Sequence, residues 1–370
     1  MILKNAVLCN TEFQWQQTDL TVENGRITAV GPAHEPGEDF SGCSILPGMI
    51  DLHIHGCAGA DVSCGDPQAV EAVSRRLAAC GVTSFCPTTM TLPEETLARS
   101  LRSVAAVMGK EPGAYIHGVY LEGPFLSPEK KGAQAAEHLQ LPNAALIRRL
   151  QALCPVRMVA LAPELPGSTA FLQEIAGELP VSIAHTAADG ACVRRAIDAG
   201  ARHATHLFNA MTGLSTREPG AVGAILDSGV TAELICDGIH ICDTTLRLAF
   251  RLLGEDRAVV ISDAMMAAGL PDGVYSLGGQ TVYTRDGAAR LADGTLAGSV
   301  SDLFNEFRHL CAIGIPPLQA IRACSINPAR VIGADSETGS LAPGKSADLL
   351  VLSEDLQTIR AVYVRGQRII

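Results

Sequence analysis

The stretch Met49-Ile-Asp51-Leu-His53-Ile-His55 decides the fold, because it is an apolar run that ends in two histidines. Four later apolar runs also carry, at or near their ends, a side chain that can bind a metal ion or move a proton: Glu122 in 116–122, His185 in 181–185, His206 in 203–207 and Asp263 in 258–263. In a (β/α)8 barrel, functional side chains gather at the C-terminal ends of the strands. The repeated placement therefore predicts such a barrel, with its functional site at that end.

The segments between these runs support the same architecture. Strand-like and helix-like segments alternate along the chain, which is typical of a parallel sheet, and eight parallel strands close a barrel. The predicted strands are 49–55, 83–87, 116–122, 156–162, 181–185, 203–207, 232–236 and 258–263, and the predicted helices are 67–80, 93–108, 144–153, 170–179 and 192–199. We therefore predict an α/β protein with a (β/α)8 TIM barrel domain over residues 51–330.

The two ends of the chain have a different pattern. Residues 19–30 contain two alternating runs joined by Asn24-Gly25, the strongest short signal for a β-hairpin. Residues 348–352 and 359–369 are also β-like, and the second contains a glycine turn at Gly366. Neither end alone makes a stable domain. We therefore predict one small β-sandwich domain built from residues 1–50 plus 331–370.

Composition limits the partners and the compartment. The formal net charge of −11 offers no basic stripe for a phosphate backbone, so we expect no nucleic-acid partner. Twelve cysteines are scattered without a C-x-x-C pair, which favours buried, reduced thiols. The N-terminus lacks a signal-peptide pattern and no apolar run reaches the ~18 residues of a membrane span. We expect a cytoplasmic protein with no membrane partner.

The histidines and the glutamate predict a metal centre. His53 and His55 point to the same face of their strand, so both imidazoles can bind one divalent ion. Glu122, His185 and His206 add one carboxylate and two imidazoles, a common ligand set for catalytic zinc that leaves a position open. Each histidine alone is more often structural, but together they predict a metal-dependent hydrolase. The cofactor is a divalent ion, with zinc the first expectation and iron, manganese or cobalt the alternatives, at one or two per subunit.

Alternation along the strands also separates other histidines from this group. His203 lies three residues before His206 and faces the other side of the strand, and His117 is excluded from the Glu122 face by the same argument.

Asp263 is predicted to be catalytic, because a carboxylate there can take a proton from the attacking water and pass it to a leaving amine. The alternative is a helix N-cap, but the following residues, 264–269, are typical of a loop.

Longer phrases resemble a known family. The segment Gly339-Ser-Leu-Ala-Pro-Gly344-Lys-Ser-Ala-Asp348 resembles the closing signature of the amidohydrolase superfamily. Five further phrases, in order over nearly the whole chain, resemble the N-acetylglucosamine-6-phosphate deacetylase family within it: Leu121-Glu-Gly-Pro-Phe125, His206-Leu-Phe-Asn-Ala-Met211, Arg217-Glu-Pro-Gly220, Asp237-Gly-Ile-His240 and Gly294-Thr-Leu-Ala-Gly-Ser299.

The resemblance implies hydrolysis of N-acetyl-D-glucosamine 6-phosphate to D-glucosamine 6-phosphate and acetate. It implies Glu122, His185 and His206 as the principal metal ligands and Asp263 as general base and acid. It implies a homodimer in which the partner subunit contributes to the phosphate site. The implied substrate-binding residues are Asn209 and Ala210 beside a metal ligand, Arg217 and His240 at the phosphate, and Leu296, Ala297 and Gly298 over the sugar and the acetyl group.

The chain departs from the family pattern at one place. Some members have a histidine after the Lys-Lys-Gly element, whereas this chain has Ala133 and Gln134, which we predict as substrate contacts. The pair His53 and His55 is intact, so a second metal site is available. No lysine ends the fourth strand, which speaks against a hydantoinase or a dihydroorotase.

Three alternatives to this function stay open. The nearest is deacetylation of N-acetylgalactosamine 6-phosphate, which differs from the first substrate in the configuration of one hydroxyl. A nucleobase deaminase is disfavoured by the phosphate-type pair Arg217 and His240. The third is a catalytically inactive amidohydrolase-like assembly protein, and the retained metal ligands and Asp263 argue against it.

Overall fold

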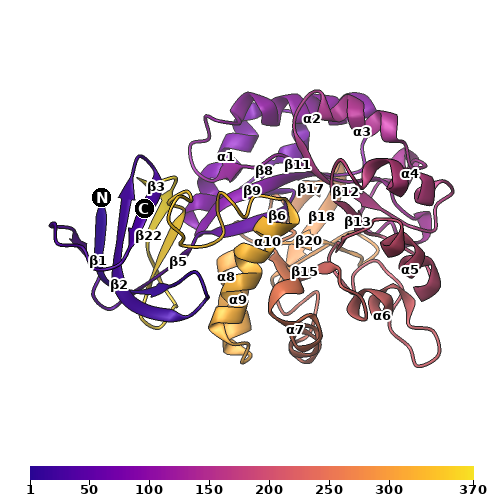
Figure 1. The fold of residues 1–370 in the computed structure, drawn as a ribbon. Helices are drawn as coiled ribbons and strands as arrows, with labels where there is room; N and C mark the ends of the chain where they lie inside the picture. The colour runs from indigo at the N-terminus through magenta and orange to yellow at the C-terminus, as the bar shows by residue number, and fades with distance from the viewer.

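All eight predicted barrel strands are present in the computed structural model, which describes residues 1–370 (Figure 1). Each strand pairs in parallel with the next, in the order β6, β9, β11, β12, β13, β14, β15 and β16. The barrel closes where β6 meets the residues after β16, through a bridge between Ile54 and Ala264. The strands are β6 (Met49–Ile54), β9 (Val82–Thr89), β11 (Val119–Phe125), β12 (Val156–Leu161), β13 (Val181–Ile183), β14 (His203–Ala204), β15 (Thr231–Ile235) and β16 (Ala258–Ile261).

Ten α-helices accompany the strands, and their apolar faces pack against the barrel in a core cluster of 75 buried residues. Several begin at a side chain that accepts a hydrogen bond from the first turn, such as Asp66 at α1 and Asp189 at α5. None has the length and apolar composition that a membrane crossing requires. The helices are α1 (Pro67–Ala79), α2 (Glu94–Val107), α3 (Ala144–Gln151), α4 (Ser168–Ile175), α5 (Gly190–Asp198), α6 (Gly220–Leu226), α7 (Asp243–Arg257), α8 (Leu303–Ala312), α9 (Pro317–Cys324) and α10 (Ile326–Val331).

The third barrel strand differs from its prediction over 116–122. The segment splits into a short strand β10 (Tyr115–Ile116) and the barrel strand β11, which continues to Phe125. The break falls at Gly118, whose φ is 141° and where an added Cβ would lie 2.6 Å from the Pro155 carbonyl oxygen. Glycine permits this close approach of two backbones. Glu122 therefore lies within its strand rather than at its end.

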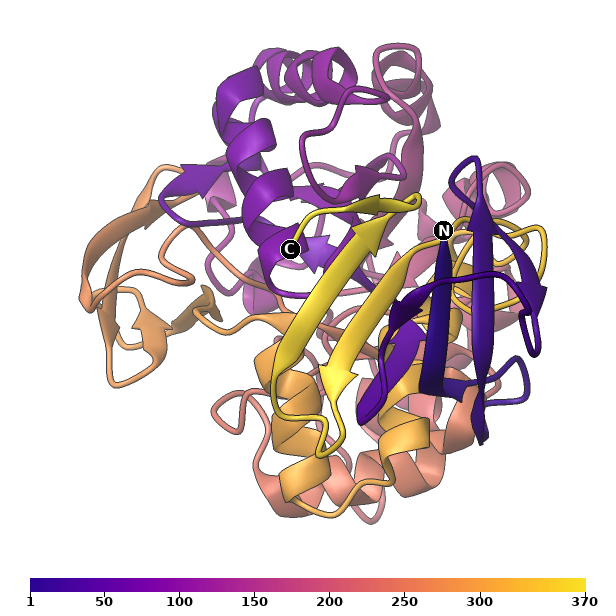
Figure 2. The ribbon, with the colours of Figure 1, turned by 90° about the vertical axis from the view of Figure 1, so that its left-hand side faces the viewer.

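The two chain ends form one sheet of eight strands beside the barrel (Figure 2). The strands of the C-terminal end lie beside β5, and Asn24 and Gly25, both at positive φ, make the predicted hairpin turn between β2 and β3. Fourteen buried apolar residues from both chain ends form a core of their own beneath this sheet, separate from the core of the barrel. The strands are β1 (Ile2–Cys9), β2 (Trp15–Glu23), β3 (Arg26–Val30), β4 (Glu38–Asp39), β5 (Cys43–Pro47), β21 (Leu349–Ser353), β22 (Ile359–Val364) and β23 (Gln367–Arg368). The domain boundaries 1–50 plus 331–370 and 51–330 stay a prediction.

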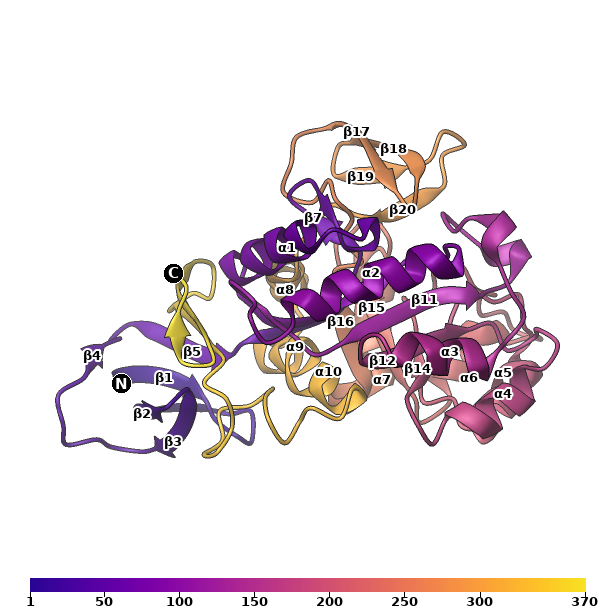
Figure 3. The ribbon, with the colours of Figure 1, turned by 90° about the horizontal axis from the view of Figure 1, so that it is seen from above.

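An inserted sheet between β16 and α8 was not predicted. Figure 3 shows it as a separate layer on the barrel, made of β17 (Gly273–Leu277), β18 (Gln280–Arg285), β19 (Ala288–Arg290) and β20 (Leu296–Ser299). The turn signals Gly278-Gly279 and Asp286-Gly287 mark its hairpins in the sequence. Its apolar side packs on Met90 and Met265 of the barrel loops. The sheet therefore supplies a wall to the space above the barrel strands.

Short elements complete the chain in the loops that follow the barrel strands. After β6 come a two-stranded ribbon and a single 3-10 turn, and two more 3-10 turns lie in the long loop after β11. These elements are β7 (Gly56–Cys57), β8 (Ala60–Asp61), η1 (Val62–Cys64), η2 (Pro128–Lys130) and η3 (Ala136–His138).

Candidate active site

A cavity of about 660 Å³ lies at the C-terminal ends of the barrel strands, between the barrel and the inserted sheet. Most of the residues predicted for the site line it: His55, Glu122, Ala133, Gln134, His185, His206, Asn209, Ala210, His240, Asp263, Leu296 and Gly298. Three predicted residues do not line it. His53 is fully buried just behind the wall, Ala297 points into the core of the inserted sheet, and Arg217 is exposed on a loop.

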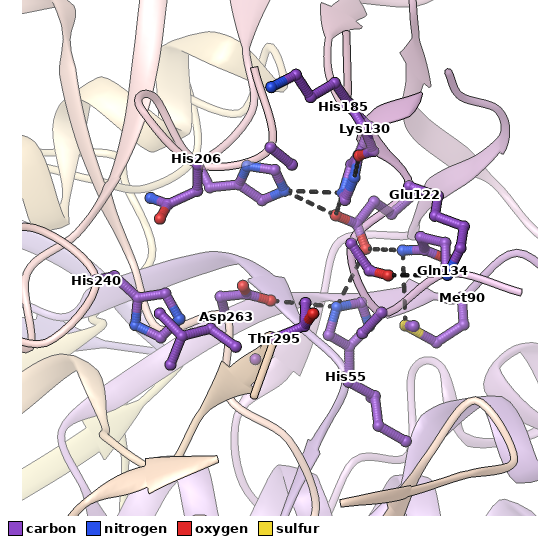
Figure 4. A pocket seen from close by; sticks show the side chains of 18 of the residues that line it. His55, Met90, Glu122, Lys130, Gln134, His185, His206, His240, Asp263 and Thr295 are labelled. Carbon is purple, nitrogen blue, oxygen red and sulfur yellow. Dashed lines mark hydrogen bonds and ion pairs between the residues drawn. The ribbon is translucent and has the colours of Figure 1, made fainter. Parts of the chain in front are cut away.

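The first group of possible ligands is Glu122, His185 and His206, from three different strands or strand ends (Figure 4). The Nε2 atoms of both histidines lie 3.0 Å from Oε1 of Glu122 and 3.1 Å from each other. All three side chains are buried. One carboxylate and two imidazoles that converge in this way match a catalytic metal site with open positions.

The second group shares Glu122 with the first. Nε2 of His53 lies 3.4 Å from Nε2 of His55, and Nε2 of His55 lies 3.3 Å from Oε2 of Glu122. Asp263 lies beside this group, because its Oδ1 lies 3.4 Å from Nε2 of His53 and 3.2 Å from Nε2 of His55. Oε1 of Glu122 therefore faces the first pair of histidines and Oε2 faces His55, so this one carboxylate lies between the two groups.

The donor set fits a cation on chemical grounds. Two imidazole nitrogens that face each other at 3.1 Å or 3.4 Å need a proton or a metal ion between them, since two lone pairs repel. Burial alone would lower the pKa of His55, but hydrogen bonds to Asp263 and Glu122 outweigh it and raise that pKa to about 9. The carboxylates thus create a field that attracts positive charge. Glu122 and the four histidines would hold the metal.

The outer ring nitrogens are held by hydrogen bonds that leave Nε2 facing the cavity. Nδ1 of His185 donates to the carbonyl of Lys130 at 2.8 Å, and Nδ1 of His55 donates to the carbonyl of Thr88 at 3.0 Å. Partners of this kind fix the tautomer and the orientation of a metal-binding histidine. In His206, by contrast, Nδ1 has no partner, so its position depends on the backbone.

Three of the predicted site residues have strained backbones. His185, His206 and Asp263 have φ of 40°, 27° and 46°, a region that residues other than glycine rarely adopt. Such strain clusters at active sites and is maintained by the surrounding structure. At Asp263 the backbone oxygen accepts the N–H of Ser299 at 2.7 Å, and Gly298 passes so close that an added Cβ would lie 2.9 Å from that oxygen.

Asp263 is the residue that the sequence predicts to transfer protons. Burial alone would raise the pKa of its carboxyl, but the charges of His53 and His55 and a hydrogen bond to His55 hold the pKa below its usual range. The carboxylate is therefore ionised and can accept a proton. It follows β16 in a loop, not as the first residue of a helix. The structure thus does not place it at a helix N-cap.

Gln134 sits directly beside Glu122. Its Nε2 donates to Oε2 of Glu122 at 2.7 Å, and its Oε1 accepts the backbone N–H of Thr91 at 2.7 Å. The contact to Thr91 fixes which end of the amide faces the glutamate. Gln134 therefore orients the shared carboxylate in addition to lining the cavity.

Other side chains that line the cavity are a further histidine, three cations and the carboxylates of Glu129 and Asp293. His240 lines it and is held by Asp237, whose Oδ2 lies 2.7 Å from Nδ1 of His240. Lys130 and Lys131 follow β11, and Arg290 comes from the inserted sheet. In Figure 4, His240 lies on the far side of the pocket from Glu122. The same cavity thus holds the possible metal ligands and side chains that can pair with an anion.

Sequence reasoning missed several residues of this site. The three cations Lys130, Lys131 and Arg290 lie in loops or in the unpredicted sheet. Glu233, in the middle of β15, is fully buried and hydrogen-bonds both His53 and His203. A charged residue inside an apolar strand was the available signal, because buried charges need partners. His203 faces away from the cavity, as the alternation argument predicted.

Comparisons with known proteins agree with this geometry. The amidohydrolase family model matches residues 44–369. The chain is 36% identical to the N-acetylgalactosamine-6-phosphate deacetylase of Escherichia coli O157:H7, covering 96% of each chain. It is also 36% identical to the N-acetylglucosamine-6-phosphate deacetylase of Bacillus subtilis strain 168, over 92% of this chain and 90% of the relative.

A solved structure covers the whole chain. The N-acetyl-D-glucosamine-6-phosphate deacetylase of Mycobacterium smegmatis, in complex with N-acetyl-D-glucosamine-6-phosphate, superposes with a TM-score of 0.93 at 32% identity, covering 100% of this chain and 99% of the other. The superposition agrees with the barrel fold, and the family match and the two relatives cover nearly the whole chain. The chain belongs to the amidohydrolase family, in its group of N-acetylglucosamine-6-phosphate deacetylases.

Proposed function

We propose that the protein hydrolyses N-acetyl-D-glucosamine 6-phosphate to D-glucosamine 6-phosphate and acetate, with a divalent metal ion as cofactor. The observation that carries the proposal is the single cavity lined both by Glu122, His185, His206 and Asp263 and by the cations Lys130, Lys131 and Arg290. The relatives named as deacetylases of this substrate and the related complex support it.

The chemistry divides between the cofactor and the side chains. When bound, the metal polarises the acyl carbonyl as a Lewis acid and lowers the pKa of water toward neutrality. Asp263 takes a proton from the attacking water as the new C–O bond forms. It then gives that proton to the amine nitrogen as the C–N bond breaks, so the sugar leaves as a neutral amine. Gln134 keeps the Glu122 carboxylate in its orientation throughout.

The rest of the cavity binds and orients the sugar. Leu296 and Gly298 form the wall over the sugar and the acetyl group, and the region of Asn209 and Ala210 beside His206 offers polar groups to the ring hydroxyls. His240 binds the phosphate, with Arg290 as an added donor from the same chain. Guanidinium groups suit phosphate because they donate two parallel hydrogen bonds.

The first prediction concerns substrate and cofactor together. Purified protein should release acetate from N-acetylglucosamine 6-phosphate, and removing the metal with a chelator should abolish release until zinc is restored. Acetate can be followed by a coupled assay. Protein that binds metal but releases no acetate from either hexosamine phosphate would move the function to another branch of the family.

A second substrate is favoured by one relative, the Escherichia coli protein named for N-acetylgalactosamine 6-phosphate. The two sugars differ in the configuration of one hydroxyl. Measuring kcat/KM for both epimers beside each other decides between them. A ratio above about tenfold corresponds to about 1.4 kcal/mol of differential binding in the transition state.

A further prediction concerns the phosphate. Arg290→Ala should raise KM for the phosphorylated sugar by about 10–100-fold, because a charge-assisted hydrogen bond contributes about 1.5–3 kcal/mol. Arg285→Ala is the matched control, since Arg285 lies on the same inserted sheet outside this cavity. An unchanged KM in the Arg290 variant would remove this residue from the phosphate site.

We also propose zinc as the metal, a cytoplasmic location and a homodimer.

Arg217 is exposed and lies outside the cavity of its own subunit, which supports a role at the phosphate bound in the partner subunit. Arg217→Ala should then weaken binding of the phosphorylated sugar, and a chain shown by light scattering to act as a monomer would exclude that role.

A further inference from the structure

Glu233 lies behind both groups of possible metal ligands. It stands on β15 and its side chain is fully buried. Oε2 lies 3.0 Å from Nδ1 of His53 and 3.1 Å from the backbone nitrogen of His206, and Oε1 lies 3.2 Å from Nε2 of His203. One carboxylate therefore contacts a histidine of each group and one histidine outside them.

The contact with His53 decides the tautomer of that ring. An ionised carboxylate only accepts hydrogen bonds, so Nδ1 of His53 must carry the proton. Nε2 then presents its lone pair to the space shared with His55, Glu122 and Asp263, at 3.4 Å, 3.6 Å and 3.4 Å from their nearest ligand atoms. Histidine binds a metal ion through such a free nitrogen, and a carboxylate on the other nitrogen increases the basicity of the ligand.

The contact with His206 acts through the backbone. The N–H of His206 donates to Oε2 of Glu233, and the N–H of Leu207 donates to the Glu233 carbonyl at 2.8 Å. These bonds hold the chain where His206 has its strained φ of 27°. That conformation directs the ring toward Glu122 and His185, although Nδ1 of His206 has no partner of its own.

The charge of Glu233 also lacks a conventional partner. Its ion-pair contacts are with His53 and His203 alone, and no lysine or arginine is paired with it. A fully buried carboxylate is costly without a positive charge nearby. A divalent cation bound to Nε2 of His53 would supply this positive charge, because the Nδ1–H on the other side of the same ring contacts Glu233.

We propose that Glu233 is a positioning residue of the metal centre, which fixes the tautomer of His53 and the backbone of His206 and thereby strengthens metal binding at His53 and His55. This inference rests on the proposed metal-dependent function. Glu233, which lies outside the cavity, would thus set the metal affinity of the group formed by His53, His55 and Glu122.

The test is a zinc titration of metal-free protein by calorimetry, with Glu233→Gln, His53→Gln and Glu306→Gln beside the unmodified chain. Glu306 is the matched control, because it is a fully buried glutamate that accepts a bond from the Cys236 amide and contacts no metal ligand. His53→Gln should abolish zinc binding at one site. Glu233→Gln should weaken the zinc affinity of that same site by about 10–100-fold. Glu306→Gln should leave it unchanged.

Two results would overturn the proposal. One is a folded Glu233→Gln protein with the zinc affinity of the unmodified chain, and the other is a zinc isotherm that His53→Gln does not alter. If Glu233→Gln fails to fold, ¹⁵N chemical shifts of His53 in the zinc-loaded, unmodified chain decide instead. A protonated Nδ1 and a metal-bound Nε2 are expected, and the reverse assignment contradicts the proposal. A chain that binds no zinc at all would instead overturn the proposed function.

Discussion

Asp263→Asn is expected to lower turnover by about 10²-fold or more while the fold and the bound metal stay unchanged. Asparagine keeps the size of the side chain and its position beside His53 and His55, but it cannot accept a proton from water. The measurement is kcat for acetate release, together with metal content by elemental analysis. The loss should appear in kcat more than in KM, because the proton moves only in the chemical step.

Asp293→Asn is the control for that variant. Asp293 lines the same cavity from the inserted sheet, but it contacts neither histidine of the second group. It should change turnover far less than Asp263→Asn does. If Asp263→Asn retained near-normal turnover with metal bound, the proton role would have to move to another residue.

Glu122→Gln is expected to reduce activity to that of chelator-treated protein, a loss of about 10³-fold or more. The reason is that a bound metal lowers the activation free energy by several kcal/mol, and this gain is lost with the metal. Glu122 is the only residue in both groups of ligands, so one substitution removes a charge from both. The amide nitrogen of glutamine cannot bind the ion, and it would place a donor against the histidines. Metal content and acetate release should fall together.

Glu306→Gln again provides a matched control. Burial raises the pKa of Glu306 well above its usual range, so this side chain is already neutral and glutamine resembles it closely. Full metal content with lost activity in Glu122→Gln would mean that Glu122 acts on the substrate rather than on the metal.

The sequence predicted the barrel strands because their signals are local. Runs such as 156–162 and 258–263 are apolar and short, and the glycines and polar residues that end them lie next to them in the chain. The hairpin at Asn24-Gly25 was predicted for the same reason, since both residues tolerate the positive φ that the turn requires. The break at Gly118 was missed because its cause, the approach of the Pro155 carbonyl, comes from a strand nearly forty residues later.

The inserted sheet was missed although its turns were visible. Gly278-Gly279 and Asp286-Gly287 stand between alternating runs, but their place after the last barrel strand did not suggest a separate layer. As a result, Arg290 entered the site only in the folded structure. Gln134 was predicted to touch substrate, and its bond to Glu122 depends on a loop whose path the sequence does not reveal.

The sequence by itself determined the barrel strands and predicted which side chains lie on or next to them at the site, because alternation and apolar runs are properties of a few adjacent residues. Only the tertiary structure decided how they combine. Glu122 lies between two pairs of histidines, Glu233 supports one histidine of each pair, and Arg217 stays outside the cavity that Arg290 enters. These relations join residues far apart in the chain, so they are set by barrel closure and loop packing, which local sequence patterns do not encode.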